Sequence, residues 1–222
     1  MKKTLLLIPF LFGVSYSAMA LPVPICTSEH LSDYEGLGST GCTIGDLTFS
    51  NFSYTPTEIG SVTTPPATSV MVDPISGVES GLTFAAGWSA GQFQLEDSLI
   101  NFKVSCTGCS IDDWVLQIGG QDETGDGIVN VAETSPEVGT GLGQSSVENV
   151  TTGVGSGTFM PVTSLSVTKD ILVYGGGTPD TSSALSSVTN LFSTIATPEP
   201  SLVILCAGLL GLVPFARRKF VR

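Results

Sequence analysis

Short stretches in which apolar and polar residues alternate, separated by turn residues, constrain the fold of this chain most strongly. In the segment Ser98–Ser105, the apolar residues Ile100, Phe102 and Val104 alternate with polar neighbours. Because successive side chains on a strand point to opposite faces, this period of two predicts strands with one buried face. Residues 21–195 are rich in Gly, Ser, Thr and Val. We therefore expect them to form one all-β domain, an antiparallel β-sandwich of the jelly-roll or immunoglobulin-like type.

The same pattern predicts where the strands lie. They are expected at 46–54, 67–72, 81–89, 98–105, 113–118, 128–133, 147–151, 158–167 and 170–174. The segment 184–195 is ambiguous, because its apolar residues have helical spacing while its Ser and Thr residues favour a strand or a linker, and we expect a final strand followed by a linker. The aromatic residues expected to fill the core are Phe49, Phe52, Phe84, Trp88, Phe93, Phe102 and Trp114.

The first twenty residues have the pattern of a secretory signal peptide. Lys2 and Lys3 precede an apolar run over residues 5–14, and Ala18 and Ala20 flank Met19 in a small-x-small cleavage pattern. A plain membrane anchor is the alternative interpretation. The apolar run is short for a membrane span and ends in polar residues, which favours export.

Charge is distributed unevenly along the chain. It has 8 Lys and Arg against 20 Asp and Glu. Only Lys103 and Lys169 among the basic residues lie between the two apolar ends, whereas nearly all the acidic residues do. Since Lys and Arg are retained on the cytoplasmic side of a membrane, this pattern predicts that both ends stay inside while the middle is translocated. An acidic middle region also repels phosphate, so we expect no nucleic-acid partner.

The C-terminal segment 196–222 combines three features. Pro198, Glu199 and Pro200 form an extended stretch that cannot continue a helix. Residues 201–216 carry no charge and would reach about 24 Å as a helix, enough for a short single transmembrane helix. A basic end over 217–222 follows, beginning with Arg217, Arg218 and Lys219.

This three-part tail resembles the PEP-CTERM sorting signal, in which a Pro-Glu-Pro motif, a short transmembrane helix and a basic end are read by a membrane-embedded exosortase. The stretch GCTIGDLTFSNFSY at residues 41–54 also resembles a recurring ectodomain type of PEP-CTERM proteins. The resemblance implies exosortase as a processing partner, in a Gram-negative bacterium that makes exopolysaccharide. It implies no activity for the ectodomain. A simple C-terminal tail anchor is the alternative.

From these features we expect a non-catalytic cell-surface or extracellular-matrix protein associated with exopolysaccharide. It would be held at the inner membrane with its domain in the periplasm before processing. The alternative is an exported β-sandwich that binds or cleaves carbohydrate. No Ser/His/Asp set or phosphate-binding loop is present, and His30 is the single histidine. The acidic pairs Glu96-Asp97 and Asp112-Asp113 lie on strands, so neither pair alone can supply two facing carboxylates, although acids from different strands could converge.

Four cysteines lie in the predicted exported region, namely Cys26, Cys42, Cys106 and Cys109. An even number in an oxidising compartment predicts two disulfides. The sequence permits three pairings, of which we favour Cys26 with Cys42 and Cys106 with Cys109. The Cys-Thr-Gly-Cys stretch is alternatively a redox site, but it follows a predicted strand and its centre is typical of a hairpin turn.

One interior stretch has the spacing of a calcium-binding loop. Oxygen-bearing residues fall at the first, third, fifth, ninth and twelfth positions, with Gly127 at the sixth. These candidate calcium ligands are Asp122, Thr124, Asp126, Asn130 and Glu133. The alternative is a Thr-Gly-Asp-Gly hairpin turn between two strands. Since the flanking segments favour strands rather than the helices of an EF-hand, we expect the turn and no cofactor.

Overall fold

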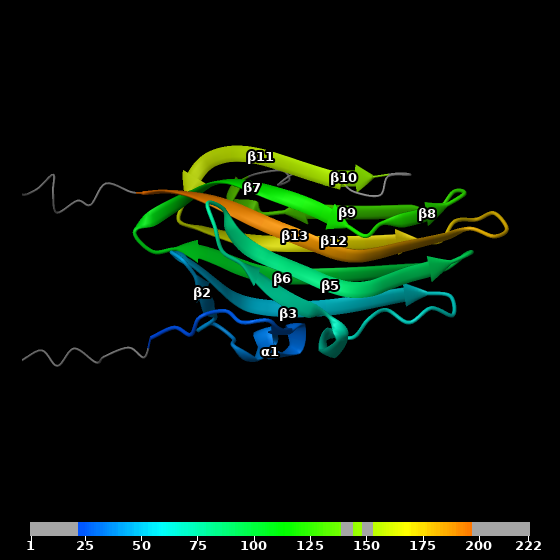
Figure 1. Ribbon diagram of the computed structural model, residues 1–222, viewed down its shortest axis with the longest axis horizontal. Helices are drawn as coiled ribbons and strands as arrows, with labels where there is room; N and C mark the ends of the chain where they lie inside the picture. The colour runs from blue at the N-terminus through cyan, green and yellow to red at the C-terminus, as the bar shows by residue number, and fades with distance from the viewer. Residues whose placement is uncertain (1–21, 139–143, 148–152, 197–222) are drawn as a thin grey trace, which may run out of the picture.

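The computed structural model describes residues 22–138, the backbone of 144–147, and residues 153–196. Two antiparallel sheets pack face to face in this part of the chain, with their strands running along the long axis of the domain (Figure 1). The prediction of an all-β sandwich is therefore confirmed. The predicted signal peptide, including Ala18 and Ala20, and the predicted tail, including Pro198 to Pro200 and Arg217 to Lys219, lie outside the described residues.

The strands of the two sheets follow one another in a mixed order along the chain. The first sheet has the order β1 (Glu29–His30), β4 (Met71–Ile75), β5 (Ser80–Gly91), β13 (Ser182–Ala196), β7 (Cys109–Gly119) and β11 (Gly153–Val162), and β8 (Asp122–Thr124) also pairs with β13. The second sheet has the order β10 (Gln144–Val147), β9 (Ile128–Thr134), β12 (Ser164–Tyr174), β6 (Leu95–Cys106), β3 (Leu47–Ile59) and β2 (Cys42–Ile44). The chain thus changes sheet eight times among the described strands, and three of these changes are between β5 and β6, between β6 and β7, and between β12 and β13.

Three short helical segments accompany the sheets. The helix α1 (Leu31–Gly36) lies beside β3 at the lower side of the sandwich in Figure 1, and the 3-10 turns η1 (Ala67–Ser69) and η2 (Pro136–Val138) lie in connections. In α1, Leu31 and Tyr34 are buried, and the Tyr34 hydroxyl donates a hydrogen bond of 2.7 Å to the Thr27 carbonyl oxygen. No helix in the described part of the chain is long and apolar enough to cross a membrane.

The core lies between the two sheets and follows the alternation of the sequence. Along β12 every second residue is buried, from Leu165 to Val173. Six of the seven aromatic residues expected in the core are buried, with an exposed fraction of at most 6%. The prediction that Phe93 lies in the core is wrong. Phe93 lies in the turn between β5 and β6 with a φ of 59°, and 62% of it is exposed. Turn geometry there turns the ring outward.

Several strand predictions need correction at their boundaries. The expected strand 67–72 begins as the 3-10 turn η1, and β4 starts only at Met71. The expected strands 158–167 and 170–174 are instead β11 and β12, which meet at Thr163. The expected break at residues 168–169 is wrong, because both residues lie in the middle of β12. The ambiguous segment 184–195 is a strand, and it forms most of β13.

Both ends of the described chain lie at the same end of the sandwich, on the left in Figure 1. Ala196, the last residue of β13, pairs with Cys109 at the start of β7. Cys106 at the end of β6 pairs with Leu47 at the start of β3. The chain therefore enters and leaves the domain close to its cysteines.

Candidate functional site

Three polar side chains lie in the interior, at positions that the alternation of their strands assigns to the core. Lys169 follows Leu165 and Val167 on the buried face of β12, and Glu133 follows Val129 and Val131 on β9. Asn190 lies between the buried Val188 and Phe192 on β13 of the opposite sheet. All three have an exposed fraction of 0%. We call Glu133, Lys169 and Asn190 the interior polar cluster.

The carboxylate of Glu133 joins the other two members. Lys169 and Glu133 are directly opposite one another on the neighbouring strands β12 and β9. The Lys169 ammonium forms an ion pair with Glu133 through Oε1, and Asn190 donates from Nδ2 to Oε2 at 2.5 Å. Each carboxylate oxygen thus accepts a hydrogen bond from a different sheet. The Oδ1 atom of Asn190 is buried and has no hydrogen-bond partner.

The surroundings of the cluster are apolar. The Lys169 Nζ atom lies 5.8 Å from the centre of the Phe84 ring, and Phe84 packs against Phe102 at 5.8 Å between ring centres. Burial lowers the pKa of Lys169, although the neighbouring Glu133 opposes this shift. Burying an ion pair costs desolvation energy that buried apolar side chains do not incur. A contribution to stability therefore does not by itself explain why the cluster is there.

The sequence does not single out this cluster as a site. In the sequence, Lys169 stands out only as one of two basic residues in the acidic region, and Glu133 only as a candidate calcium ligand. The available signal was a polar residue in an apolar register, as in Leu165-x-Val167-x-Lys169 and Val129-x-Val131-x-Glu133. That signal predicts burial of each residue, but it cannot show that strands distant in sequence bring the three together.

The candidate calcium ligands are dispersed between two environments. Glu133 belongs to the interior polar cluster, whereas Asp122, Thr124 and Asp126 are exposed. Asp126 accepts hydrogen bonds from the backbone nitrogens of Gly177 at 3.0 Å and Thr178 at 3.3 Å, and from Thr178 Oγ1 at 2.8 Å. These bonds, led by the one from Gly177, lower the pKa of Asp126. Among the described residues, no three His, Cys, Asp or Glu side chains lie close enough to hold a metal ion.

The Thr-Gly-Asp-Gly stretch forms a turn, but the expected hairpin is wrong. β8 before the turn belongs to the first sheet and β9 after it to the second. The turn is fastened to the connection between β12 and β13 by Asp126 and by Thr124, whose Oγ1 accepts a hydrogen bond of 2.8 Å from the Ser182 nitrogen. Its side chains therefore hold two connections together at the far end of the sandwich.

Both favoured cysteine pairs lie at disulfide distance in the structure. The Cα atoms are 4.9 Å apart for Cys26 and Cys42 and 5.3 Å apart for Cys106 and Cys109, within the usual range for disulfides. Gly108, with a φ of +76°, allows the tight turn between the second pair. This turn joins β6 to β7 in different sheets, so it is a corner of the sandwich and not the expected hairpin.

Acidic side chains from different strands do converge at one place on the second sheet. Asp97 on β6 lies beside Asp170 on β12, and burial, then a hydrogen bond and the charge of Asp170, raise the pKa of Asp97 to about 6. Glu96 is buried and accepts a hydrogen bond of 2.9 Å from the Ser89 nitrogen. Burial dominates and raises the pKa of Glu96 to about 7. The hydrogen-bonded carboxyl groups of Asp97 and Asp170 are closer together than the two carboxyl groups of a glycoside hydrolase.

Asp112 and Asp113 on β7 do not combine with those acids. Asp113 accepts a hydrogen bond of 3.1 Å from the Ser193 nitrogen. Asp112 lies at the irregularity where the pairing between β7 and β13 shifts. The two aspartates therefore lie at the irregularity in the pairing of β7 with β13.

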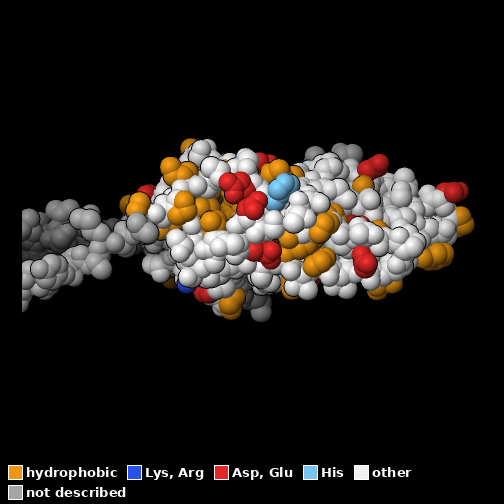
Figure 2. All heavy atoms as spheres, turned by 90° about the horizontal axis from the view of Figure 1, so that it is seen from below, with side chains coloured by type: hydrophobic (Ala, Val, Ile, Leu, Met, Phe, Trp, Pro, Cys, Tyr) orange, Lys and Arg blue, Asp and Glu red, His pale blue; other side chains and the backbone are white. Residues whose placement is uncertain are grey.

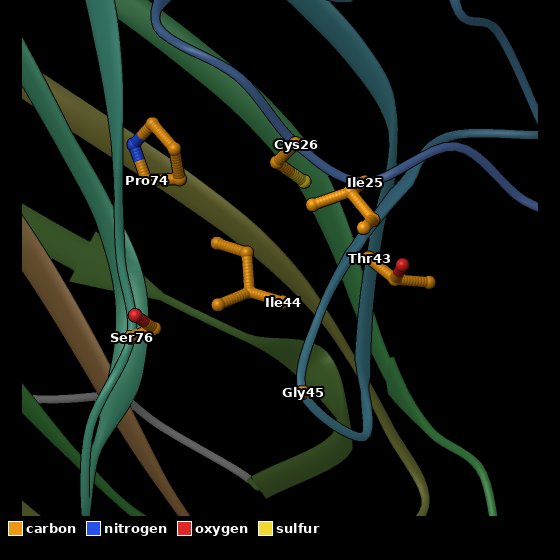
Figure 3. A pocket seen from close by; sticks show the side chains of 7 residues that line it. All are labelled: Ile25, Cys26, Thr43, Ile44, Gly45, Pro74 and Ser76. Atoms are coloured by element: carbon orange, nitrogen blue, oxygen red, sulfur yellow. The ribbon is translucent and has the colours of Figure 1, made fainter.

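A shallow pocket of about 440 Å³ lies between the N-terminal segment, β2 and the end of β4. Figure 3 shows Ile44 between Ile25 and Cys26 on one side and Pro74 and Ser76 on the other. The remaining lining residues are Thr43 and Gly45, so the lining carries no aromatic ring or charged group.

The outer surface is acidic. Figure 2 shows Asp and Glu side chains spread over one face with very little Lys or Arg. His30 is exposed at the start of α1, and its backbone nitrogen donates to Asp33 Oδ2 at 3.2 Å. The exposed surface seen here gives no basic region for binding phosphate groups.

Comparison with known proteins leaves the family open. No protein-family model and no curated protein matches the chain. Among solved structures, it is similar to the enzymatically active domain of tailspike protein 4 from bacteriophage CBA120, with a TM-score of 0.28 and 8% identity. The match covers 64% of this chain and 19% of the tailspike chain. At this TM-score the likeness carries no argument about function.

Proposed function

We propose that the protein is an exported, non-catalytic cell-surface or extracellular-matrix protein that is held and then processed through its C-terminal tail. The observation that carries this proposal is the place where the chain leaves the domain. β13 ends at Ala196, and Pro198 follows two residues later. The described sandwich therefore precedes the Pro-Glu-Pro motif in the sequence, and both ends of the described chain lie at the same end of the domain (Figure 1).

This arrangement suits a domain that is tethered at one end. An extended Pro-Glu-Pro segment next to the membrane is accessible to a processing enzyme, because proline prevents the helix from continuing through it. The folded sandwich then projects away from the membrane surface. The resemblance of the tail to the PEP-CTERM signal supports exosortase as that enzyme.

The chemistry of the domain supports an oxidising, extracytoplasmic environment. Cys26 and Cys42, and Cys106 and Cys109, lie at disulfide distance in the structure. Disulfides persist in the periplasm and outside the cell and are rare in the cytosol. Association with exopolysaccharide after processing is part of the proposal and rests on the sorting signal rather than on a glycan site.

The test changes the motif and follows the location of the protein in its native cells. Replacing Pro198, Glu199 and Pro200 together with alanine is expected to leave the full-length chain in the inner-membrane fraction, while wild type is released or surface-attached. Ser201→Ala is the matched control, since it lies next to the motif, and should behave as wild type. Equal distribution of the triple variant and wild type would contradict processing at this motif.

A second readout tests export separately from processing. A thiol-reactive reagent should label none of the four domain cysteines in unreduced protein taken from cells. A domain found in the cytosol with these cysteines labelled would contradict export. A domain that is oxidised but unprocessed would contradict only the role of the tail.

A further inference from the structure

We propose that Lys169 and Asn190 become joined by an intramolecular isopeptide bond, with Glu133 carrying the protons and ammonia as the leaving group. The inference goes beyond the proposed function and does not depend on export. It rests on three observations about the interior polar cluster: its members share one carboxylate, they are fully buried, and one atom of Asn190 has no hydrogen-bond partner.

Lys169 has the properties of a nucleophile at this place. An amine attacks a carbonyl carbon only when it is neutral, and a lysine ammonium is neutralised when burial disfavours its charge. Lys169 is fully buried next to the Phe84 ring, and its proton points to a carboxylate that can accept it. In this fully buried site, transfer of that proton to Glu133 removes two opposite charges from an apolar environment.

Asn190 has the properties of the electrophile. Its Nδ2 atom is held by Glu133 Oε2, so a protonated Glu133 is in place to donate a proton to the nitrogen that must leave. Its Oδ1 atom accepts no hydrogen bond and is free to take up the charge that develops during attack. Because one carboxylate binds Lys169 Nζ and Asn190 Nδ2, the amine and the amide are held next to each other without diffusion.

The reaction is balanced without any further reactant. Lys169 first gives one proton to Glu133, and the Nζ lone pair then forms a bond to Asn190 Cγ. Glu133 transfers the first proton to Nδ2, and its carboxylate, free again, then accepts the second proton that the intermediate loses from Nζ. The bond between Cγ and Nδ2 breaks, and the pair of electrons leaves with ammonia. The products are a secondary amide between the two side chains, one molecule of ammonia and a protonated Glu133, with no change of oxidation state.

The position of the bond gives it a structural consequence. Lys169 lies on β12 of the second sheet and Asn190 on β13 of the first, so the bond ties the two layers of the sandwich together. β13 is also the last strand before the tail. A covalent tie on that strand resists separation of the sheets when the domain is pulled from its C-terminal end.

Peptide mapping of the full chain, purified after expression and then reduced and denatured, tests the proposal. A protease that cuts after Tyr174 separates Lys169 from Asn190 in the chain. The expected result is one species containing both peptides, with a mass below their sum by about 17 Da, the mass of ammonia. Fragmentation should place the link at Lys169 and Asn190. A folded wild-type protein that yields the two unlinked peptides at full mass would overturn the proposal.

Variants distinguish the bond between Lys169 and Asn190 from other modifications that lower the mass by a similar amount. Asn190→Ala and Lys169→Arg should give unlinked peptides, because the first lacks the carbonyl group and the second lacks an amine that can be neutralised. Glu133→Gln should reduce linked product at least about tenfold, since its amide cannot carry the protons. Lys103→Arg, at the other lysine of the acidic region, should remain linked.

Two further outcomes would count against the proposal even if some variants fail to fold. Ammonia loss from Asn190 alone, with no linked peptide, indicates ring closure on its own backbone. A link between Lys169 and Glu133 would lose water, about 18 Da, and would place the reacting carbonyl on the wrong residue. Both readings come from wild-type protein, so they do not depend on the stability of any variant.

Discussion

Lys169 and Asn190 lie on interior strands of opposite sheets, and their side-chain nitrogens hydrogen-bond to the two oxygens of the Glu133 carboxylate. A sandwich of this kind can be packed with apolar side chains alone, as the remainder of the buried alternating positions on β12 shows. Polar groups at its centre carry a desolvation cost that a hydrophobic replacement avoids. A covalent product explains their presence better than an ion pair kept for stability.

Ser98 is predicted to hold a buried hydrogen-bond network whose loss destabilises the fold. Its Oγ accepts from Trp88 Nε1 at 3.1 Å and lies 2.8 Å from the Tyr54 hydroxyl. Ser98→Ala leaves the buried indole donor without a partner and should lower the free energy of unfolding by about 1 to 3 kcal/mol. Denaturant unfolding measures this, with exposed Ser156→Ala as control. Equal losses in the two variants would contradict the network.

Stability is predicted to increase as the pH falls from about 8 to about 5. Burial raises the pKa of Glu96 from 4.5 to about 7, and burial together with Asp170 raises that of Asp97 from 3.8 to about 6. Because the folded state binds these protons more tightly than the unfolded state, the free energy of unfolding decreases as pH rises through this window. Denaturant unfolding at several pH values measures the slope.

The variants Glu96→Gln and Asp97→Asn should each flatten that pH dependence, since each removes one titrating group. Glu137 gives the matched contrast. Although burial opposes the shift, hydrogen bonds from Ser135 and Ser166 lower its pKa to about 2. Its contribution is therefore lost only below pH about 4.5, so Glu137→Gln should leave the slope between pH 5 and 8 unchanged. A slope unaltered in Glu96→Gln and Asp97→Asn would refute the assignment.

The two disulfides are predicted to contribute unequally to stability. Cys26 and Cys42 close a loop with a separation of 16 residues, against 3 for Cys106 and Cys109. In the chain-entropy account, removal costs about 3 kcal/mol for the longer loop and about 2 kcal/mol for the shorter one. Unfolding of the two double Cys→Ser variants tests this. A larger loss for the 106–109 variant would contradict the order.

Calcium is predicted to have no effect on the melting temperature. Glu133 is engaged by Lys169 and Asn190, and Asp126 by Gly177 and Thr178, so the loop spacing does not produce a ligand set. Thermal unfolding in excess chelator and in millimolar calcium should give the same midpoint. A midpoint that rises with calcium and returns with chelator would revive the loop as a calcium site.

The period of two located the strands well, because burial of one face is a local property of each strand. Lys169 shows the limit of this reasoning: it falls in the gap between the expected strands 158–167 and 170–174, although its register with Val167 and Ile171 assigns it to the core. The alternation also could not show which sheet a strand joins. Cys106 and Cys109, expected at a hairpin, connect two sheets, because a tight turn fits either arrangement. The interior polar cluster depends on that long-range topology.

The direct test of the proposed function is the intact mass of the mature protein purified from its native cells. We predict a chain that has lost residues 1–20 and ends at or beside Pro198 to Pro200, after allowance for any group attached to the new end. A mature product that retains Arg222 would contradict processing at the sorting motif and would indicate a simple tail anchor.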